Sequence, residues 1–336
     1  MIGLGLVGYG YWGPNLLRNF AKQKDCTVRY VCDQSEGRRA AAEAAQPGVR
    51  TTADFADLLN DPEVQAIAIA TPTSSHFPLA LQALQAGKHV LVEKPMTASV
   101  AQGEQLLAEA KARGLTLMVD HTFIYTPAVR RMRELVKSGE LGDVLYYDST
   151  RINLGLFQHD VDVLWDLAVH DLSILAYLVD DKPVAVSATG KAHVAGSPEN
   201  VAFLTVSFGG PTIAHVNVNW LAPVKIRRTI LGGSRKMVVY DDLEPSEKIK
   251  IYDKGVTIAE TPEEAQRMRV GYRIGDMHAP NLDNFEALSV EAAHFLDCIA
   301  TGKTPDTPGD MGLQVVRILE AATQSMREGG RSVAIA

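Results

Sequence analysis

Residues 87–96 have the sequence GKHVLVEKPM, and this stretch decides the fold of the first part of the chain. The run from His89 to Val92 is apolar and β-branched, which predicts a strand buried in a parallel sheet. Pro95 cannot donate a hydrogen bond to a sheet, so the strand should end near Glu93. Ligands of open α/β sheets bind beyond the carboxyl ends of the strands. Lys94 is therefore either a functional side chain or a surface lysine that closes a strand.

A glycine-rich motif follows the first apolar strand of the chain. Residues 8–13 have the sequence GYGYWG, and a helical pattern begins directly after them. Gly8 permits a tight turn, Gly10 lets a diphosphate approach the backbone, and Gly13 lets helix and strand pack closely. The start of the helix then offers free N–H groups to phosphates. The motif predicts a dinucleotide site if an acid follows at the right distance.

Such an acid stands at the end of the second apolar strand. Asp33 lies twenty residues beyond Gly13, where a carboxylate accepts hydrogen bonds from a ribose diol. Its charge would repel the 2′-phosphate of NADP, so NAD is the expected cofactor and NADP is less favoured. Arg38 and Arg39 could soften that repulsion, although arginines on a helix are more often solvated.

Strand and helix patterns alternate up to residue 120. This alternation predicts a parallel sheet covered by helices on both faces, that is, a Rossmann domain over residues 1–120. The loop from Thr71 to His76 also follows a strand and should line the cofactor cleft. The expected elements are strands at 64–70, 89–92 and 115–120 and helices at 78–86 and 99–113.

Beyond residue 120 the pattern changes to strands at hairpin spacing after one basic helix, 127–137. It predicts an α+β domain over residues 121–336, built on a largely antiparallel, open-faced sheet. Residues 214–220 alternate apolar and polar side chains, and their apolar face favours a homodimer or homotetramer. The remaining expected elements are strands at 144–153, 184–193, 201–208, 212–220, 225–231 and 236–241, a strap at 275–288, and helices at 289–300 and 309–327.

Residues 163–175 have the sequence VLWDLAVHDLSIL, which predicts a helix buried on nearly all sides. Asp166, His170 and Asp171 are costly there unless they are paired. Asp166 and His170 are spaced i, i+4, so the carboxylate could orient the imidazole and raise its basicity. The alternative is an ordinary His–Asp pair of the core. No third ligand has a spacing that would suggest a metal.

Composition excludes several classes of protein. The 336 residues carry a net charge of −7, which argues against nucleic acid as a partner. No apolar run is long enough to span a bilayer, and the apolar N-terminus lacks a basic leader. Cys26, Cys32 and Cys298 have no metal spacing, so we expect reduced thiols and a cytoplasmic protein.

Three motifs together resemble the glucose–fructose oxidoreductase/inositol dehydrogenase/MocA family. They are the glycine motif at 8–13, Glu93-Lys94-Pro95, and Asp166 followed by His170-Asp171. The resemblance spans nearly the whole chain. The segments 10–15 and 275–325 look most like the nucleotide-sugar branch, which includes dehydrogenases acting at C3 of sugars of the UDP-N-acetylglucosamine type.

The resemblance implies roles for individual residues. Lys94 would contact the nicotinamide ribose and the reacting hydroxyl, and His170 would be the acid/base with Asp166 beside it. The sheet of the second domain would form the substrate wall and an oligomer interface. His121 departs from the family, in which many members carry asparagine. The residues expected to bind the cofactor are Gly8, Gly10, Tyr11, Trp12, Gly13, Asp33, Thr71, Pro72, Thr73, His76, Glu93, Lys94 and His121.

The sequence thus predicts an NAD-dependent dehydrogenase that oxidises a secondary alcohol of a sugar, linked to a nucleotide. Other hypotheses are an inositol or free-sugar dehydrogenase and a ketosugar reductase. A different class of protein, a sensor that binds the dinucleotide without turnover, is also compatible with the fold. The joint presence of Lys94, Asp166 and His170 argues against the sensor.

Overall fold

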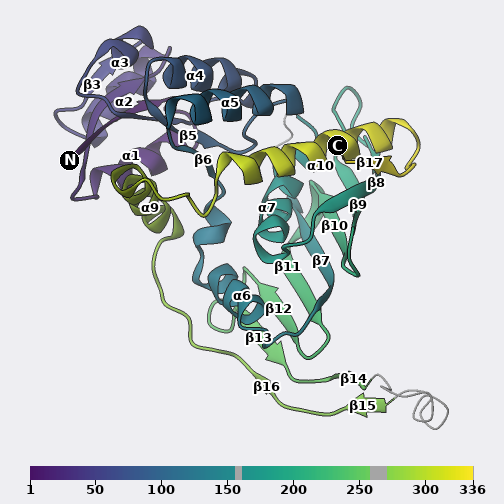
Figure 1. Cartoon of the computed structure of the whole chain (residues 1–336). Helices are drawn as coiled ribbons and strands as arrows, with labels where there is room; N and C mark the ends of the chain where they lie inside the picture. The colour runs from purple at the N-terminus through teal and green to yellow at the C-terminus, as the bar shows by residue number, and fades with distance from the viewer. Residues whose placement is uncertain (156–160, 258–270, 336) are drawn as a thin grey trace. The chain divides into compact units, whose positions relative to one another are not determined.

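A computed structural model describes residues 1–155, 161–257 and 271–335 (Figure 1). The chain forms two compact units. The first comprises Met1–Thr126 and Phe285–Arg317, and the second comprises Pro127–Asn284 and Ile318–Ala336. The sequence predicted a single boundary at residue 120. The chain instead passes from the first unit to the second and back, because residues 285–317 belong to the first unit. The assignment of substrate binding to the second unit remains a prediction.

The first unit is built on a six-stranded sheet in which all neighbouring strands are parallel. The strand order is β3-β2-β1-β4-β5-β6, so the order reverses between β1 and β4. This reversal opens a crevice for ligands at the carboxyl ends of the strands. The Rossmann prediction is confirmed. The strands are β1 (Ile2–Val7), β2 (Cys26–Cys32), β3 (Arg50–Thr52), β4 (Ala66–Ile69), β5 (His89–Glu93) and β6 (Leu117–Asp120).

The helices of the first unit pack against the sheet and against one another, α1 with α9 and α4 with α5. α4 begins at Thr73, five residues earlier than expected, and Pro78 lies inside it. Pro78 is the sixth residue of the helix and has no N–H, so the i→i−4 hydrogen bond to the Ser74 carbonyl is missing there. The helices are α1 (Gly13–Ala21), α2 (Glu36–Ala45), α3 (Ala56–Asn60), α4 (Thr73–Gln85), α5 (Val100–Arg113), the 3-10 turn η1 (Thr122–Tyr125) and α9 (Ala287–Thr301).

The second unit contains a nine-stranded mixed sheet in the order β16-β13-β12-β11-β7-β10-β9-β8-β17. β7 and β10 are parallel, and the other neighbours in this sheet are antiparallel. A separate hairpin pairs β14 with β15. The strands are β7 (Val144–Leu154), β8 (Pro183–Lys191), β9 (Val201–Phe208), β10 (Ile213–Asn219), β11 (Leu221–Gly233), β12 (Met237–Asp241), β13 (Ile249–Tyr252), β14 (Gly255–Thr257), β15 (Gly271–Arg273), β16 (Met277–His278) and β17 (Val333–Ala334).

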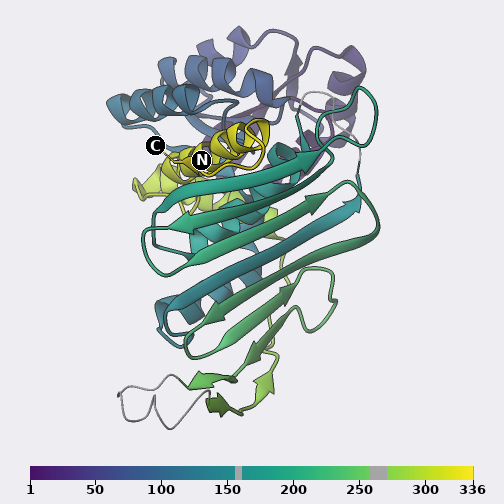
Figure 2. The same cartoon turned by 90° about the vertical axis from the view of Figure 1, so that its right-hand side faces the viewer.

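Helices cover one face of this sheet, and Figure 2 shows the opposite face. The helical elements are α6 (Pro127–Lys137), the π-helical turn η2 (Leu164–Ala168), α7 (Val169–Leu178) and α10 (Gly309–Arg327), which contributes to both units. The expected strap at 275–288 contains the short strand β16, and its last two residues already belong to α9. Strands β13 to β16 were missed because their apolar runs are short.

The apolar face at residues 214–220 is covered by the chain itself, so the expectation that this face favours an oligomer is wrong. Ala214, Val216, Val218 and Trp220 are all 0% exposed within the single chain, and β10 packs against η2. These side chains are therefore core, and they leave no apolar surface for a second subunit to cover. The outward side chains of β10 are Ile213, His215, Asn217 and Asn219.

Candidate functional site

The glycine loop between β1 and α1 forms an open cradle. Gly8 has a φ of +92°, and a Cβ there would lie 2.4 Å from the carbonyl oxygen of Ala70. A Cβ on Gly13 would lie 2.3 Å from the carbonyl oxygen of Gly8. A Cβ on Gly10 would meet only the tip of Arg38, at 3.7 Å. The space beside Gly10 and the N–H groups at the start of α1 fit a diphosphate.

Asp33 lies directly beyond β2 and is tied to the glycine loop. One carboxylate oxygen accepts a hydrogen bond from the Tyr9 N–H at 2.7 Å, and the other accepts one from the Ser35 N–H at 2.8 Å. The Arg38 guanidinium lies 3.7 Å from Asp33, with more than half of its side chain exposed. Arg39 donates to the carbonyl oxygen of Asp33. Both arginines are thus held near the aspartate rather than only solvated.

Residues 71–76, beyond β4, include a buried histidine that joins two strand ends. The ring nitrogens of His76 lie 2.8 Å from the carbonyl oxygens of Pro95 and Thr71. Burial lowers the pKa of His76, although the two carbonyls oppose this effect. With 1% exposure, His76 fixes the backbone around Lys94 rather than offering its ring to a ligand.

Residues 87–96 contain the strand β5, which ends before Pro95 as predicted. β5 ends at Glu93, and Lys94 follows with a half-buried side chain. The Lys94 N–H donates to a carboxyl oxygen of Glu93 at 3.2 Å. Burial raises the pKa of Glu93 well above its ordinary value, with the neighbouring Asp120 as the next cause. Lys94 opposes this rise but does not cancel it.

Asp120, at the end of β6, is the centre of a buried cluster. Its carboxyl accepts hydrogen bonds from the Trp12 indole N–H, at 3.0 Å, and from the Thr122 hydroxyl. The carboxyls of Glu93 and Glu291 are its acidic neighbours, and neither Glu291 oxygen has a hydrogen-bond partner among the described residues. Sequence analysis missed Glu291. The available signal was a glutamate on the apolar face of an otherwise apolar helix, between Leu288 and Phe295.

His121 follows Asp120 and is 1% exposed. Burial lowers its pKa to about 4, with the nearby Lys94 contributing, so the ring is neutral at physiological pH. Neither ring nitrogen has a hydrogen-bond partner in the described ranges. Among the expected cofactor ligands, Tyr11 is 89% exposed and stacks on Trp12, with 6.5 Å between ring centroids.

In the second unit, Asp166 and His170 lie on either side of a helical junction. The expected regular helix begins as a π-helical turn, in which the Val169 N–H reaches the Leu164 carbonyl. Single π-turns within helices occur frequently at functional sites. Trp220 donates its indole N–H to Asp166 at 3.1 Å. Asp166 and His170 are half-buried, whereas Ala168 and Val169 between them are buried, so both polar side chains are partly accessible.

Asp171 is the paired core residue of this helix. The Arg151 guanidinium donates to it at 2.6 Å, and the Ser149 hydroxyl donates at 2.5 Å. Both partners come from β7, and the three side chains are buried. Asp171 therefore fixes α7 on the sheet, which leaves the neighbouring His170 as the candidate for chemistry.

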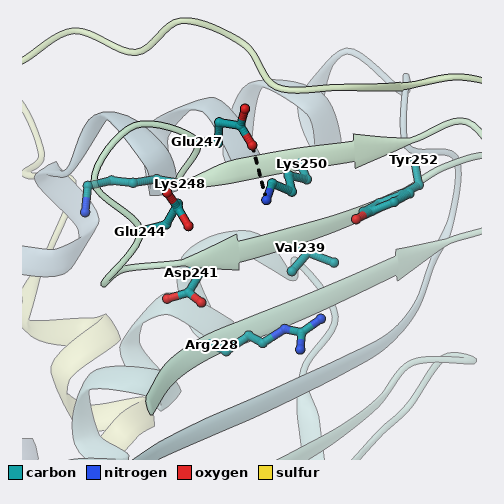
Figure 3. A pocket seen from close by; sticks show the side chains of 8 residues that line it. All are labelled: Arg228, Val239, Asp241, Glu244, Glu247, Lys248, Lys250 and Tyr252. Carbon is teal, nitrogen blue, oxygen red and sulfur yellow. Dashed lines mark ion pairs between the residues drawn. The ribbon is translucent and has the colours of Figure 1, made fainter. Parts of the chain in front are cut away.

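Two cavities lie away from these residues. One, of about 440 Å³, opens in the first unit beside α5 and includes His89, at the amino-terminal end of β5. The other, of about 150 Å³, lies over β11 to β13 in the second unit, and Figure 3 shows the charged side chains that line it. Neither contains a predicted site residue. Across residues 1–155, 161–257 and 271–335, no cluster of His, Cys, Asp and Glu suits a metal, and no helix is long and apolar enough to cross a membrane.

The strand order, the glycine cradle and the acid beyond β2 define a dinucleotide-binding oxidoreductase. The model of the oxidoreductase family with the NAD-binding Rossmann fold matches residues 2–121, and that of the GFO/IDH/MocA C-terminal domain matches residues 129–239. The chain belongs to this family, as the three motifs predicted, and its cofactor is NAD.

Individual relatives match over nearly the full length. The UDP-N-acetylglucosamine 3-dehydrogenase of Acidithiobacillus ferrooxidans is 30% identical over 327 residues, which cover 95% of each chain. Its solved structure superposes with a TM-score of 0.82 at 26% identity, covering 97% of this chain and 98% of that one. The scyllo-inositol 2-dehydrogenase (NAD(+)) of Bacillus subtilis is 26% identical over 347 residues, covering 98% of this chain and 94% of the relative.

Proposed function

We propose that the protein oxidises a secondary alcohol of a nucleotide-linked sugar, at C3, with NAD as the hydride acceptor. The similarity to the UDP-N-acetylglucosamine 3-dehydrogenase over 95% of both chains supports this substrate class. The observation that carries the catalytic part is Lys94, half-buried directly beyond β5 in the unit that contains the NAD cradle. Inositol is the second candidate, because an inositol dehydrogenase matches the chain over a similar length.

The residues of the first unit bind and orient the cofactor in this proposal. The glycine loop holds the diphosphate, and Asp33 accepts hydrogen bonds from the adenosine ribose. When bound, NAD supplies the hydride acceptor, and the protein contributes placement and proton handling. Pro72, Thr73 and Tyr11 are proposed to line the same crevice. The buried His76 is proposed to hold the backbone of this crevice in place through the carbonyls of Thr71 and Pro95.

Proton transfer is assigned to Lys94 and His170. A neutral His170 takes the proton of the reacting hydroxyl, and the Lys94 ammonium orients that hydroxyl and the nicotinamide ribose. Asp166, held by Trp220, sets the charge environment of the imidazole. The half-exposure of His170 is compatible with this role, since a proton acceptor must be reached by substrate.

The direct test is the absorbance of NADH with UDP-sugars, free sugars and inositols. Turnover with UDP-N-acetylhexosamines above all others is the expected result. Preference for inositol would replace the substrate class and leave the fold assignment intact. NAD binding without turnover on any polyol would favour a sensor.

His170 separates the enzyme from the sensor. If neutral His170 accepts the proton, the oxidation rate should rise with pH through one basic group. His170→Asn should abolish that rise and cost much of the rate, while NAD affinity stays close to the wild-type value. His193→Asn, at an exposed histidine beyond the end of β8, is the matched control. Coinciding pH–rate profiles for wild type and His170→Asn would remove His170 from the mechanism.

Cofactor preference follows from Asp33. We expect tighter binding of NAD than of NADP, because the carboxylate repels a 2′-phosphate and bonds a free diol. Arg38 lies 3.7 Å from this carboxylate and is the residue able to weaken that preference. Titration of both cofactors against wild type and Arg38→Ala measures how much Arg38 weakens the preference for NAD over NADP. Tighter binding of NADP by wild type would show that Arg38 dominates Asp33.

We further propose a homo-oligomer formed through the outward face of the sheet in Figure 2. This face combines aliphatic and aromatic side chains, such as Phe203 and Ile213, with charges of both signs, such as Arg228 and Asp241 in Figure 3. A surface of mixed sign can complement a second copy of itself across a two-fold axis. Light scattering should report a dimer or tetramer, and Phe203→Asp should shift it to monomer. A wild-type monomer at micromolar concentration would refute this proposal.

A further inference from the structure

We propose that Glu291 is a positioning residue of the cofactor site. As a neutral carboxylic acid, it donates a hydrogen bond to Asp120 and thereby holds Trp12 of the glycine loop in place. The inference depends on NAD binding and not on the identity of the sugar. The first unit contains all the residues involved.

The geometry centres on Asp120, which accepts from several sides. The Trp12 indole N–H reaches one carboxyl oxygen at 3.0 Å, and the Thr122 hydroxyl donates to the other. Two further carboxyls lie next to Asp120, that of Glu93 at the end of β5 and that of Glu291 on α9, the helix that packs on η1. Asp120 therefore links the glycine loop, the end of β5 and a helix from the last quarter of the chain.

A proton is needed to make the contact between Glu291 and Asp120 attractive. Glu291 is 0% exposed, and neither of its oxygens accepts a hydrogen bond from any described N–H or O–H donor. The single hydroxyl proton of Thr122 is used by Asp120. Two ionised carboxyls in this position would repel each other in a poorly solvated site. One carboxyl that keeps its proton turns the repulsion into a hydrogen bond.

The charged surroundings leave the proton on the glutamate. Burial raises the pKa of Glu291 well above its ordinary value, and the negative charge of Asp120 is the next cause. The positive charge of Lys94 acts on Glu93 and His121. His121 is neutral, with a pKa lowered to about 4, and so supplies no balancing charge. The neutral acid is therefore the form that fits the site.

The functional consequence is a pH limit on cofactor binding. Loss of the Glu291 proton at alkaline pH would place a second charge against Asp120. The cluster would then separate, and Trp12 would lose the acceptor that fixes the loop between Gly10 and Gly13. NAD affinity should fall as a result, even though Glu291 itself contacts neither cofactor nor substrate.

The experiment measures NAD dissociation constants by calorimetry from pH 6 to pH 10, for wild type, Glu291→Gln, Glu291→Leu and the control Glu320→Gln on the exposed side of α10. Glutamine donates the same hydrogen bond but cannot ionise, so Glu291→Gln should match wild type at pH 7 and lose less affinity at alkaline pH. Glu291→Leu should bind about tenfold more weakly at pH 7, because a hydrogen bond to a charged group is lost. The control should follow wild type throughout.

Two outcomes would overturn the proposal. One is a wild-type pH dependence retained by Glu291→Gln, and the other is equal NAD affinity for the glutamine and leucine variants at every pH. If Glu291→Leu does not fold, the comparison of wild type with Glu291→Gln still decides. Because sugar is absent from the assay, failure of the proposed substrate class leaves this test unaffected.

Discussion

The two units each bury an acid next to a residue proposed for catalysis, and they neutralise it in opposite ways. In the second unit, Asp171 beside His170 is bound by the Arg151 guanidinium, and both side chains are at most 4% exposed. In the first unit, Glu93 beside Lys94 has the carboxyl of Asp120 as its neighbour, and its raised pKa favours the protonated form. The ion pair in the second unit gives a rigid support. The protonated acid in the first unit makes the local structure depend on pH. Each of the following predictions tests one side of this difference.

The largest effect is expected for Lys94. Lys94→Ala removes the cation that orients the hydroxyl, so turnover should fall by about 10²–10⁴. The protein should stay folded and bind NAD, because the side chain is half-buried and lies outside the strand. Steady-state rates and NAD titration check this, with the exposed Lys24→Ala as control. Near-normal turnover would make Lys94 a surface lysine that closes a strand.

Substitution of Arg151 tests how much the buried ion pair with Asp171 stabilises the protein. Arg151→Met leaves Asp171 buried without its cation and should destabilise the protein by about 3–5 kcal/mol. The double variant Arg151→Met/Asp171→Leu should recover much of this loss, since both charges are removed. The control Arg131→Met breaks an exposed ion pair with Glu134 and should cost at most about 1 kcal/mol. Denaturant unfolding measures all three variants, and equal losses for the two arginines would contradict the comparison.

The variant Glu93→Gln tests whether Glu93 keeps its proton in the folded protein. Its pKa is raised in the folded protein, so between the ordinary value of 4.5 and the folded value the native state binds the extra proton. The free energy of unfolding should therefore fall, by about 1.4 kcal/mol per pH unit for this group, as pH rises through that window. Glu93→Gln should remove this contribution.

Unfolding curves at pH 5, 6 and 7 reveal the difference between wild type and Glu93→Gln. The variant should gain stability relative to wild type with each step, while the exposed Glu320→Gln should not. A constant difference across the three pH values would mean that Glu93 is ionised in the folded protein.

The smallest effect concerns the indole that holds Asp166. Trp220→Phe removes the donor, and the expected loss of stability is about 1–2 kcal/mol, because half-exposed Asp166 can turn to water. The turnover rate should fall as well, since Asp166 is no longer fixed near His170. Trp165→Phe is the matched control, because that indole donates to the neutral Thr323 hydroxyl. Equal rates in both variants would separate Asp166 from catalysis.

Local patterns predicted the elements that depend on neighbouring residues. The glycine motif, Asp33 and the alternation of strands were sufficient for the first sheet, and the strand at 201–208 and the helices at 127–137 and 309–327 have the predicted bounds. Turn residues and apolar periods determine such elements, and both are visible along the chain. The assignments of Lys94, His170 and Asp166 to catalysis remain predictions.

Contacts between distant segments were not predictable in the same way. Glu291 lies more than 170 residues beyond Asp120 in the chain, and its place next to Asp120 depends on the return of α9 to the first unit. The π-turn at 164–168 depends on Asp162, which accepts hydrogen bonds from the Leu164 and Trp165 N–H groups. The apolar alternation of 214–220 was read correctly as one covered face, but sequence could not show that the cover is the chain's own helices.

The return of residues 285–317 to the first unit has a consequence for synthesis on the ribosome. The strands of the parallel sheet emerge early, but α9, which packs against α1 through Phe295 and Phe20, emerges only after most of the second unit. Until then, the apolar side of α1 lacks the helix that covers it. We therefore expect the nascent first unit to gain protease resistance only near chain completion, and a fragment ending at residue 126 to be insoluble.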